Sequence, residues 1–143
     1  MTQYEHTQIG HVIILFVAAA LFAINAIFGS SPRRESFLVV SVVLLITLAL
    51  FYKLTITINE ETLCASFGIG MIRKRVSVAE FAACGPIRIR WWYGWGIHLT
   101  QYGWLYNVSG LDAVAITLRN GRKFALGTDD PQGLAEALRS AIE

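Results

Sequence analysis

Charged residues are scarce in this chain of 143 residues, and scarcest near its start. Asp, Glu, Lys and Arg make up 15% of the sequence, against roughly a quarter in ordinary soluble domains. No charged residue lies between His6 and Arg33, and no Lys or Arg precedes the first apolar run. A secretory signal requires a basic segment before its apolar core. We therefore interpret the first apolar run as a retained membrane helix.

The chain also lacks the residue patterns of enzymes and metal sites. Cys64 and Cys84 have neither CxxC spacing nor a disulfide framework, and the three histidines are too dispersed to hold a metal. No phosphate-binding loop, nucleophile elbow, HExxH motif or paired carboxylates occur. A net charge of +2 is too small for the basic stripe that nucleic-acid binding needs. We predict no catalytic residues, no metal, no cofactor and no nucleic-acid partner.

Two long apolar stretches, His11–Phe28 and Phe37–Tyr52, dominate the first third of the chain. The second is short for a hydrocarbon core of ~30 Å, but basic side chains at its two ends can reach the membrane interfaces. The sequence Gly-Ser-Ser-Pro at 29–32 breaks the helix between the stretches. We predict a tail over residues 1–10 and a transmembrane helical hairpin over 11–52, which places the N-terminus and the remaining chain on one side.

The pattern changes abruptly after Tyr52, without a Gly, Ser or Pro spacer. Leu54, Ile56 and Ile58 alternate with polar residues, as in a half-buried strand. Further alternating segments follow, and Asn120-Gly121 is a strong hairpin signal. Asp130-Pro131 then predicts the start of an amphipathic C-terminal helix. Residues 53–143 are therefore expected to form a small domain of about seven antiparallel strands, bent into a barrel that this helix plugs.

Several segments of this domain resemble those of bacterial pleckstrin-homology-like (PH-like) domains. They are Tyr93–Ile97, Tyr102–Gly110, Asn120–Arg122 and Gly127–Pro131. The whole layout is similar to small uncharacterised bacterial membrane proteins in which two helices precede such a domain. The resemblance implies a membrane-anchored α+β protein with a seven-stranded PH-like barrel that is capped by the C-terminal helix and lies in the cytoplasm.

The side of the membrane on which the domain lies is predicted differently by two criteria. Arg33 and Arg34 in the hairpin loop outnumber Lys53 at the other end, which favours a cytoplasmic loop and an external domain. The resemblance implies a cytoplasmic domain, and we follow it. We expect a multi-pass protein of the bacterial inner membrane.

Aromatic residues gather in one segment, together with His98. One interpretation is a platform at headgroup level, where Trp and Tyr are favoured, or a surface for a partner. The alternative is that alternate rings fill the core of the barrel. The candidate interface residues are Trp91, Trp92, Tyr93, Trp95, Tyr102 and Trp104.

Basic residues on two of the expected strands form a second candidate surface. They could attract anionic lipid headgroups, each contributing about 1 kcal/mol, or they could simply be solvated. Because the first hairpin loop, Asn59-Glu60-Glu61, is acidic, we do not expect phosphoinositide recognition. The candidate headgroup contacts are Arg73, Lys74, Arg75, Arg88 and Arg90.

Asn25 is a polar residue within the first membrane helix, where an amide usually bonds to another helix. That contact lies either within the hairpin or with a larger partner. Taken together, these features predict a non-catalytic interaction module. We expect an accessory subunit or assembly factor whose partners are membrane lipids and other membrane-protein subunits, or a second copy. The alternative function is a sensor of anionic lipid.

Overall fold

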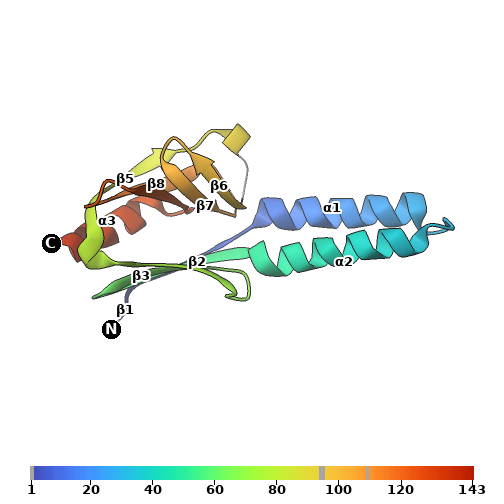
Figure 1. Cartoon of the computed structure of the whole chain (residues 1–143), viewed down its shortest axis with the longest axis horizontal. Coiled ribbons are helices and arrows are strands. Elements are labelled where there is room, and N and C mark those ends of the chain that lie inside the picture. The colour runs from blue at the N-terminus through green and yellow to red at the C-terminus, as the bar shows by residue number, and fades with distance from the viewer. Residues whose placement is uncertain (1, 94–95, 109) are drawn as a thin grey trace.

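The computed structural model describes residues 2–93, 96–108 and 110–143. An α-helical hairpin projects from a β-rich globular part (Figure 1). The elements in chain order are β1 (Thr2–Ile9), α1 (His11–Phe28), α2 (Arg34–Phe51), β2 (Lys53–Asn59), β3 (Thr62–Phe67), β4 (Ile72–Ser77), η1 (Val78–Glu80), β5 (Phe81–Arg88), η2 (Trp91–Tyr93), β6 (Gly96–Thr100), β7 (Gly103–Asn107), β8 (Asp112–Leu118), β9 (Lys123–Gly127) and α3 (Pro131–Ile142).

The first sheet contains a strand that the sequence patterns did not reveal. Residues 2–9 form β1 instead of a tail, and β1 pairs antiparallel with β2 in a sheet of order β1-β2-β3-β4. The inward-facing positions of β1 include His6 and buried Gln8, whereas Ile9 is exposed. Apolar alternation, which marked β2, is therefore missing from β1. The globular part comprises β1 as well as the predicted domain over 53–143.

The second sheet has the order β5-β8-β9-β7-β6. Its pairs are antiparallel except for β7 and β9, which run parallel, with Leu105 opposite Ala125. The predicted closed barrel is wrong, because the two sheets are open and no strand pair within the described residues joins them. The physical reason is that β4 continues through η1 into β5, and β5 then pairs with β8 rather than with β4.

The main hydrophobic core lies between the two sheets and α3. Inward residues of β2 and β3, such as Ile58 and Leu63, are fully buried there together with Ile116 of β8. α3 contributes Leu134 and Leu138, and it packs chiefly against β5 and β8. The predicted start of this helix is confirmed, because the Asp130 carboxylate accepts a hydrogen bond from the Gly133 amide at 3.1 Å.

The helical hairpin has almost no buried surface of its own. Val17 is the buried residue of α1, and α2 has none. Both helices are long and apolar enough, by length and composition, to cross a membrane. α1 has the predicted bounds, whereas α2 begins three residues earlier than predicted, at Arg34. The Phe28 and Phe37 rings stack at a centroid distance of 3.8 Å beside the loop that joins the helices.

Three backbone hydrogen bonds lie at the junction between the hairpin and the globular part, and one of them reaches a helix. The Gly10 amide donates to the Tyr52 carbonyl at 2.7 Å, and the Gly68 amide donates to the Lys53 carbonyl at 2.8 Å. The Ile69 amide reaches the Ala49 carbonyl in the last turn of α2 at 3.2 Å. Because Gly68 has φ +52° and a Cβ there would lie 2.2 Å from that same carbonyl oxygen, the close approach requires glycine.

Candidate functional site

The predicted interface residues do not form a single surface in the structure. One group lies at the end of the globular part from which the helices project, which we call the helix-side end. A second group lines an opening between the two sheets. The remaining aromatic residues are part of the packed interior or lie outside the described residues.

The short helix η2, which contains Trp91 and Trp92, lies at the helix-side end (Figure 1). Their side chains are 70% and 56% exposed, and their rings meet edge to face at a centroid distance of 5.9 Å. The guanidinium carbon of Arg90 lies 4.9 Å from the centre of the Trp92 ring. Arg88 and Arg90 both face solvent, as predicted. We call Arg88, Arg90, Trp91 and Trp92 the tryptophan corner.

Tyr93 and Tyr102 belong to a second, smaller hydrophobic cluster on the other face of the five-stranded sheet. Both rings are half-buried against a centre formed by Ile89, Leu105, Ala113 and Ala125. These two tyrosines therefore have a packing role in a cluster that is separate from the core between the sheets. Trp95, a further predicted interface residue, lies outside the described residues.

A cleft with a volume of about 620 Å³ lies between β4 and the facing strands of the second sheet. We call it the basic cleft. Lys74 and Arg75 contribute from β4, and Arg122 and Lys123 contribute from the turn between β8 and β9 and the start of β9. The other residues that line it are Val76, Glu80, Leu99, Gly103, Trp104, Tyr106, Leu118, Asn120 and Phe124.

Aromatic rings surround one of the cations in the basic cleft. The Lys74 ammonium lies 5.5 Å from the centre of the Phe124 ring and 5.9 Å from that of Tyr106. Burial raises the pKa of the Tyr106 phenol, whose hydroxyl is a hydrogen-bond donor. Trp104 is 50% exposed and offers a further ring. Arg73, also predicted as a headgroup contact, does not line the cleft, and its Nε donates to the Gly70 carbonyl at 2.5 Å.

The sequence patterns identified Lys74, Arg75 and Trp104 but not Arg122 and Lys123. The latter two directly follow the predicted Asn120-Gly121 turn, and their position in the sequence suggested no link to β4. Pairing of β8 with β9 and the packing of the two sheets bring them to the cleft.

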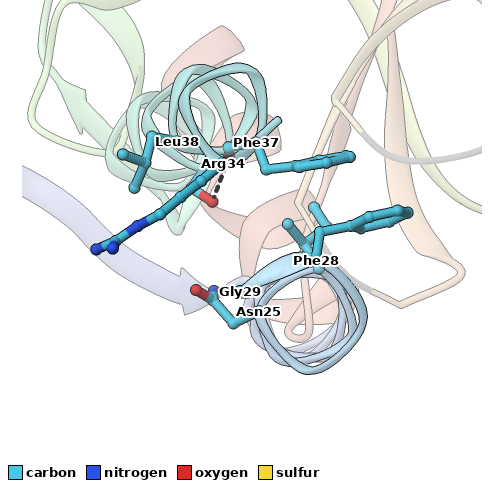
Figure 2. A pocket seen from close by; sticks show the side chains of 8 residues that line it. Asn25, Phe28, Gly29, Arg34, Phe37 and Leu38 are labelled. Carbon is cyan, nitrogen blue, oxygen red and sulfur yellow. Dashed lines mark hydrogen bonds between the residues drawn. The ribbon is translucent and has the colours of Figure 1, made fainter. Parts of the chain in front are cut away.

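Asn25 lines a small cavity between α1 and α2, with a volume of about 210 Å³ (Figure 2). Asn25 and Arg34 lie on one side of the hairpin, and the stacked Phe28 and Phe37 rings lie on the other (Figure 2). The Asn25 amide nitrogen donates to the Leu21 carbonyl of its own helix at 2.8 Å. A hydrogen bond from Asn25 to another helix therefore stays a prediction, because the bond in the structure lies within α1.

An apolar groove of about 490 Å³ lies where the helical hairpin meets β6. Its walls are residues from both helices together with Ile97 and His98. Sequence patterns did not reveal it, because it depends on the position of β6 beside the hairpin. The groove is continuous with the exposed apolar surface of α1, to which Phe16 belongs.

Two ionisable residues of β1 pair with the aspartates that precede α3. His6 Nε2 pairs with the Asp129 carboxylate, and the Tyr4 hydroxyl donates to Asp130 at 3.2 Å. Cys64 and Cys84 are free thiols, and burial raises the pKa of Cys84. Within the described residues, no three His, Cys, Asp or Glu side chains lie together in a way that could hold a metal ion.

A scan against protein-family models finds no match to this chain. Searches among curated proteins and among solved structures likewise find no similar protein.

Proposed function

We propose that the protein is a non-catalytic interaction module held at the bacterial inner membrane, where it serves as an accessory subunit or assembly factor of a membrane complex. In this proposal α1 and α2 cross the bilayer twice, and the globular part lies at the cytoplasmic surface. The partners are membrane lipids and other membrane-protein subunits.

The proposal is based on two features of the helices: their apolar side chains are exposed, and both helices continue directly into strands of the first sheet. Residues such as Phe22 and Ile27 are 79% and 70% exposed, and burying such side chains in lipid is favourable. β1 leads into α1 with Gly10 between them, and α2 leads into β2 with Tyr52 between them. The junction hydrogen bonds described above limit hinge motion, so the globular part presents one fixed surface to a neighbour in the membrane.

A PH-like fold is part of the proposal. Two packed sheets with a C-terminal helix against their core support it. The parallel pairing of β7 with β9 and the presence of nine strands among the described residues depart from the seven-stranded antiparallel pattern. We therefore base the function on the anchor and the surfaces rather than on the fold family.

Purification of the tagged, full-length protein in mild detergent tests the proposed function. We expect a distinct larger species with other membrane proteins at native expression levels. Recovery of a bare monomer under those conditions would contradict the proposal. A tagged two-helix membrane protein of unrelated sequence, expressed to the same level, controls for nonspecific recovery in micelles.

The second candidate function, sensing of anionic lipid, is favoured by the tryptophan corner. Arg88 and Arg90 beside two exposed indoles combine charge attraction with a preference for the interface. Full-length protein is required for the test, because a fragment that starts at Lys53 would lack β1. In nanodiscs with brominated lipids, we expect quenching of the corner tryptophans to increase with anionic lipid content. Quenching that does not change with the anionic lipid content would refute the sensor function. The double variant Trp91→Phe/Trp92→Phe shows which part of the fluorescence signal comes from the corner tryptophans.

A further inference from the structure

We infer that the basic cleft binds an extended, acidic segment of a partner protein that also carries aromatic or large apolar side chains. This inference rests on the proposed function and specifies the chemistry of the partner. It assigns the cleft, rather than the tryptophan corner, as the site of protein recognition.

Charge in the cleft is strongly one-sided. Lys74, Arg75, Arg122 and Lys123 line it, whereas Glu80 is the one acidic residue among those that line it. Within the part of the chain that the structure describes, none of these four cations forms a salt bridge. Like charges gathered in a cleft raise its positive potential, and an anionic ligand relieves that repulsion. The protein as a whole has a net charge of only +2, so the positive charge is local to this site.

The apolar part of the cleft indicates more than an inorganic anion. Leu99 is 70% exposed and Trp104 is 50% exposed, and both stand among the cations. Exposed aromatic and apolar residues beside basic ones are typical of protein-recognition surfaces, in which Trp, Tyr and Arg supply most of the binding energy. A ligand that satisfies both features carries carboxylates and apolar side chains.

The cations stand on two walls, which favours an extended ligand. Lys74 and Arg75 are successive residues of β4, whereas Arg122 and Lys123 belong to the opposite wall. A single phosphate is a compact anion, but a peptide can present carboxylates at intervals along its backbone. The cleft volume of about 620 Å³ falls within the range of ligand sites, roughly 300–1,000 Å³.

The position of the cleft distinguishes a protein ligand from the lipids of the bilayer. Lys74 pairs with Ala65, which pairs with Ile56, three residues beyond Lys53 at the start of β2. At about 3.3 Å per residue, this places Lys74 roughly 10 Å beyond the start of β2. The headgroup layer extends only about 5–8 Å beyond the hydrocarbon core. β2 runs on from α2 away from the hairpin (Figure 1), so the cleft faces the aqueous phase.

Fluorescence anisotropy of full-length protein in zwitterionic nanodiscs tests this inference. The probe is a short labelled peptide that alternates Glu with Phe, and the matched peptide replaces each Glu with Gln. We expect the acidic peptide to bind at least about tenfold more tightly, and its affinity to fall as ionic strength rises. Equal binding of the two peptides, or binding of neither, would overturn the inference.

A matched pair of charge reversals locates the binding site. Arg122→Glu places an anion in the cleft, and Arg139→Glu makes the same charge change on the exposed end of α3. We expect Arg122→Glu to weaken peptide binding about fivefold or more; fivefold is about 1 kcal/mol, the upper end of the range for one exposed ion pair. Arg139→Glu should leave the affinity within about twofold. Equal losses in both variants would mean that the peptide senses overall charge, and the inference would fail.

The two proposals fail in different ways. If partners co-purify with wild type and with Arg122→Glu alike, and no acidic peptide binds, the inference about the cleft is overturned while the proposed function stands. If no partner co-purifies although the acidic peptide binds and Arg122→Glu weakens it, the accessory-subunit role fails and the cleft assignment stands. Weaker binding of Arg122→Glu to anionic nanodiscs, with peptide affinity unchanged, would assign the cleft to lipid instead.

Discussion

The helical hairpin is richer in apolar residues than the globular part, and the two regions place those residues in opposite environments. Among the described residues of α1 and α2, only Val17 is buried. In β2 the alternate residues Leu54, Ile56 and Ile58 are at most 2% exposed. The globular part buries apolar side chains in its own core, whereas the hairpin exposes its apolar side chains on its outer surface. A hairpin of this kind is stable where the surroundings are apolar, and this comparison supports the proposed membrane anchor.

The largest expected effect comes from removing the same ring in each region. Phe67 is fully buried beside the rings of Phe51 and Tyr106, at centroid distances of 5.5 Å and 6.2 Å. We expect Phe67→Ala to lower the free energy of unfolding by about 3–5 kcal/mol. Phe22→Ala on the exposed face of α1 should change it by less than about 1 kcal/mol. Urea unfolding in detergent, followed by Trp fluorescence, measures both, and equal losses would contradict the comparison.

A charge placed in each region gives the next largest effect. Val43 is 55% exposed at the middle of α2, and Asp at the centre of a membrane helix costs about 2.5–3.5 kcal/mol. We expect Val43→Asp to reduce the fraction of protein that resists carbonate extraction from membranes. Ala79→Asp, at an exposed position of η1, should leave that fraction unchanged. Retention of Val43→Asp at the wild-type level would argue against a spanning α2.

Two glycines with positive φ test the junction between the regions. Gly68 and Gly121 have φ +52° and +87°, but only the Cβ at position 68 would meet backbone atoms within 4 Å. Gly121→Ala should therefore cost only about 1–2 kcal/mol from the left-handed conformation. We expect Gly68→Ala to cost at least about 1 kcal/mol more and to increase protease cleavage near Lys53. Equal stabilities of the two variants would mean that the backbone at the junction can shift to accommodate the added Cβ at little cost.

The smallest effect concerns the pH dependence of the globular part. Burial, followed by the charge of Asp130 and its hydrogen bond, raises the pKa of Tyr4. Above a pH of about 10 the unfolded chain loses this proton while the folded protein keeps it, so stability falls as pH rises. We expect Tyr4→Phe to cost about 0.5–1.5 kcal/mol at neutral pH and to reduce the alkaline loss. Tyr106, whose pKa is also raised, accounts for part of the remaining loss.

The sequence predicted the elements with strong apolar periodicity or distinctive turn residues. The bounds of α1, the strand after Tyr52, the Asn120-Gly121 turn and the cap at Asp130 are confirmed. β1 was missed because its inward residues are polar, so no hydrophobic period marks it. The closed barrel was predicted wrongly because local patterns specify strands but not which strands pair with each other. The parallel pair of β7 and β9, for example, joins strands from two separate hairpins.

The candidate sites likewise combine features that the sequence shows with features that only the tertiary structure shows. Runs such as Arg73-Lys74-Arg75 and Trp91-Trp92 are visible in the sequence, but their grouping is not. The tertiary structure separates Trp92 from Trp104 and turns Arg73 toward Gly70. It also brings Arg122 to the same cleft as Lys74. Side chains from distant segments share a surface only after sheet pairing and packing have fixed their positions.

Local chemistry alone determined that this chain has two apolar helices followed by alternating strands and a capped terminal helix. Those features depend on the hydropathy and backbone preferences of neighbouring residues, which the sequence contains directly. Only the folded arrangement decided that residues 2–9 complete a sheet, that the sheets stay open, and that four cations face one cleft. Such features depend on contacts between distant segments, and many alternative pairings satisfy the same local pattern.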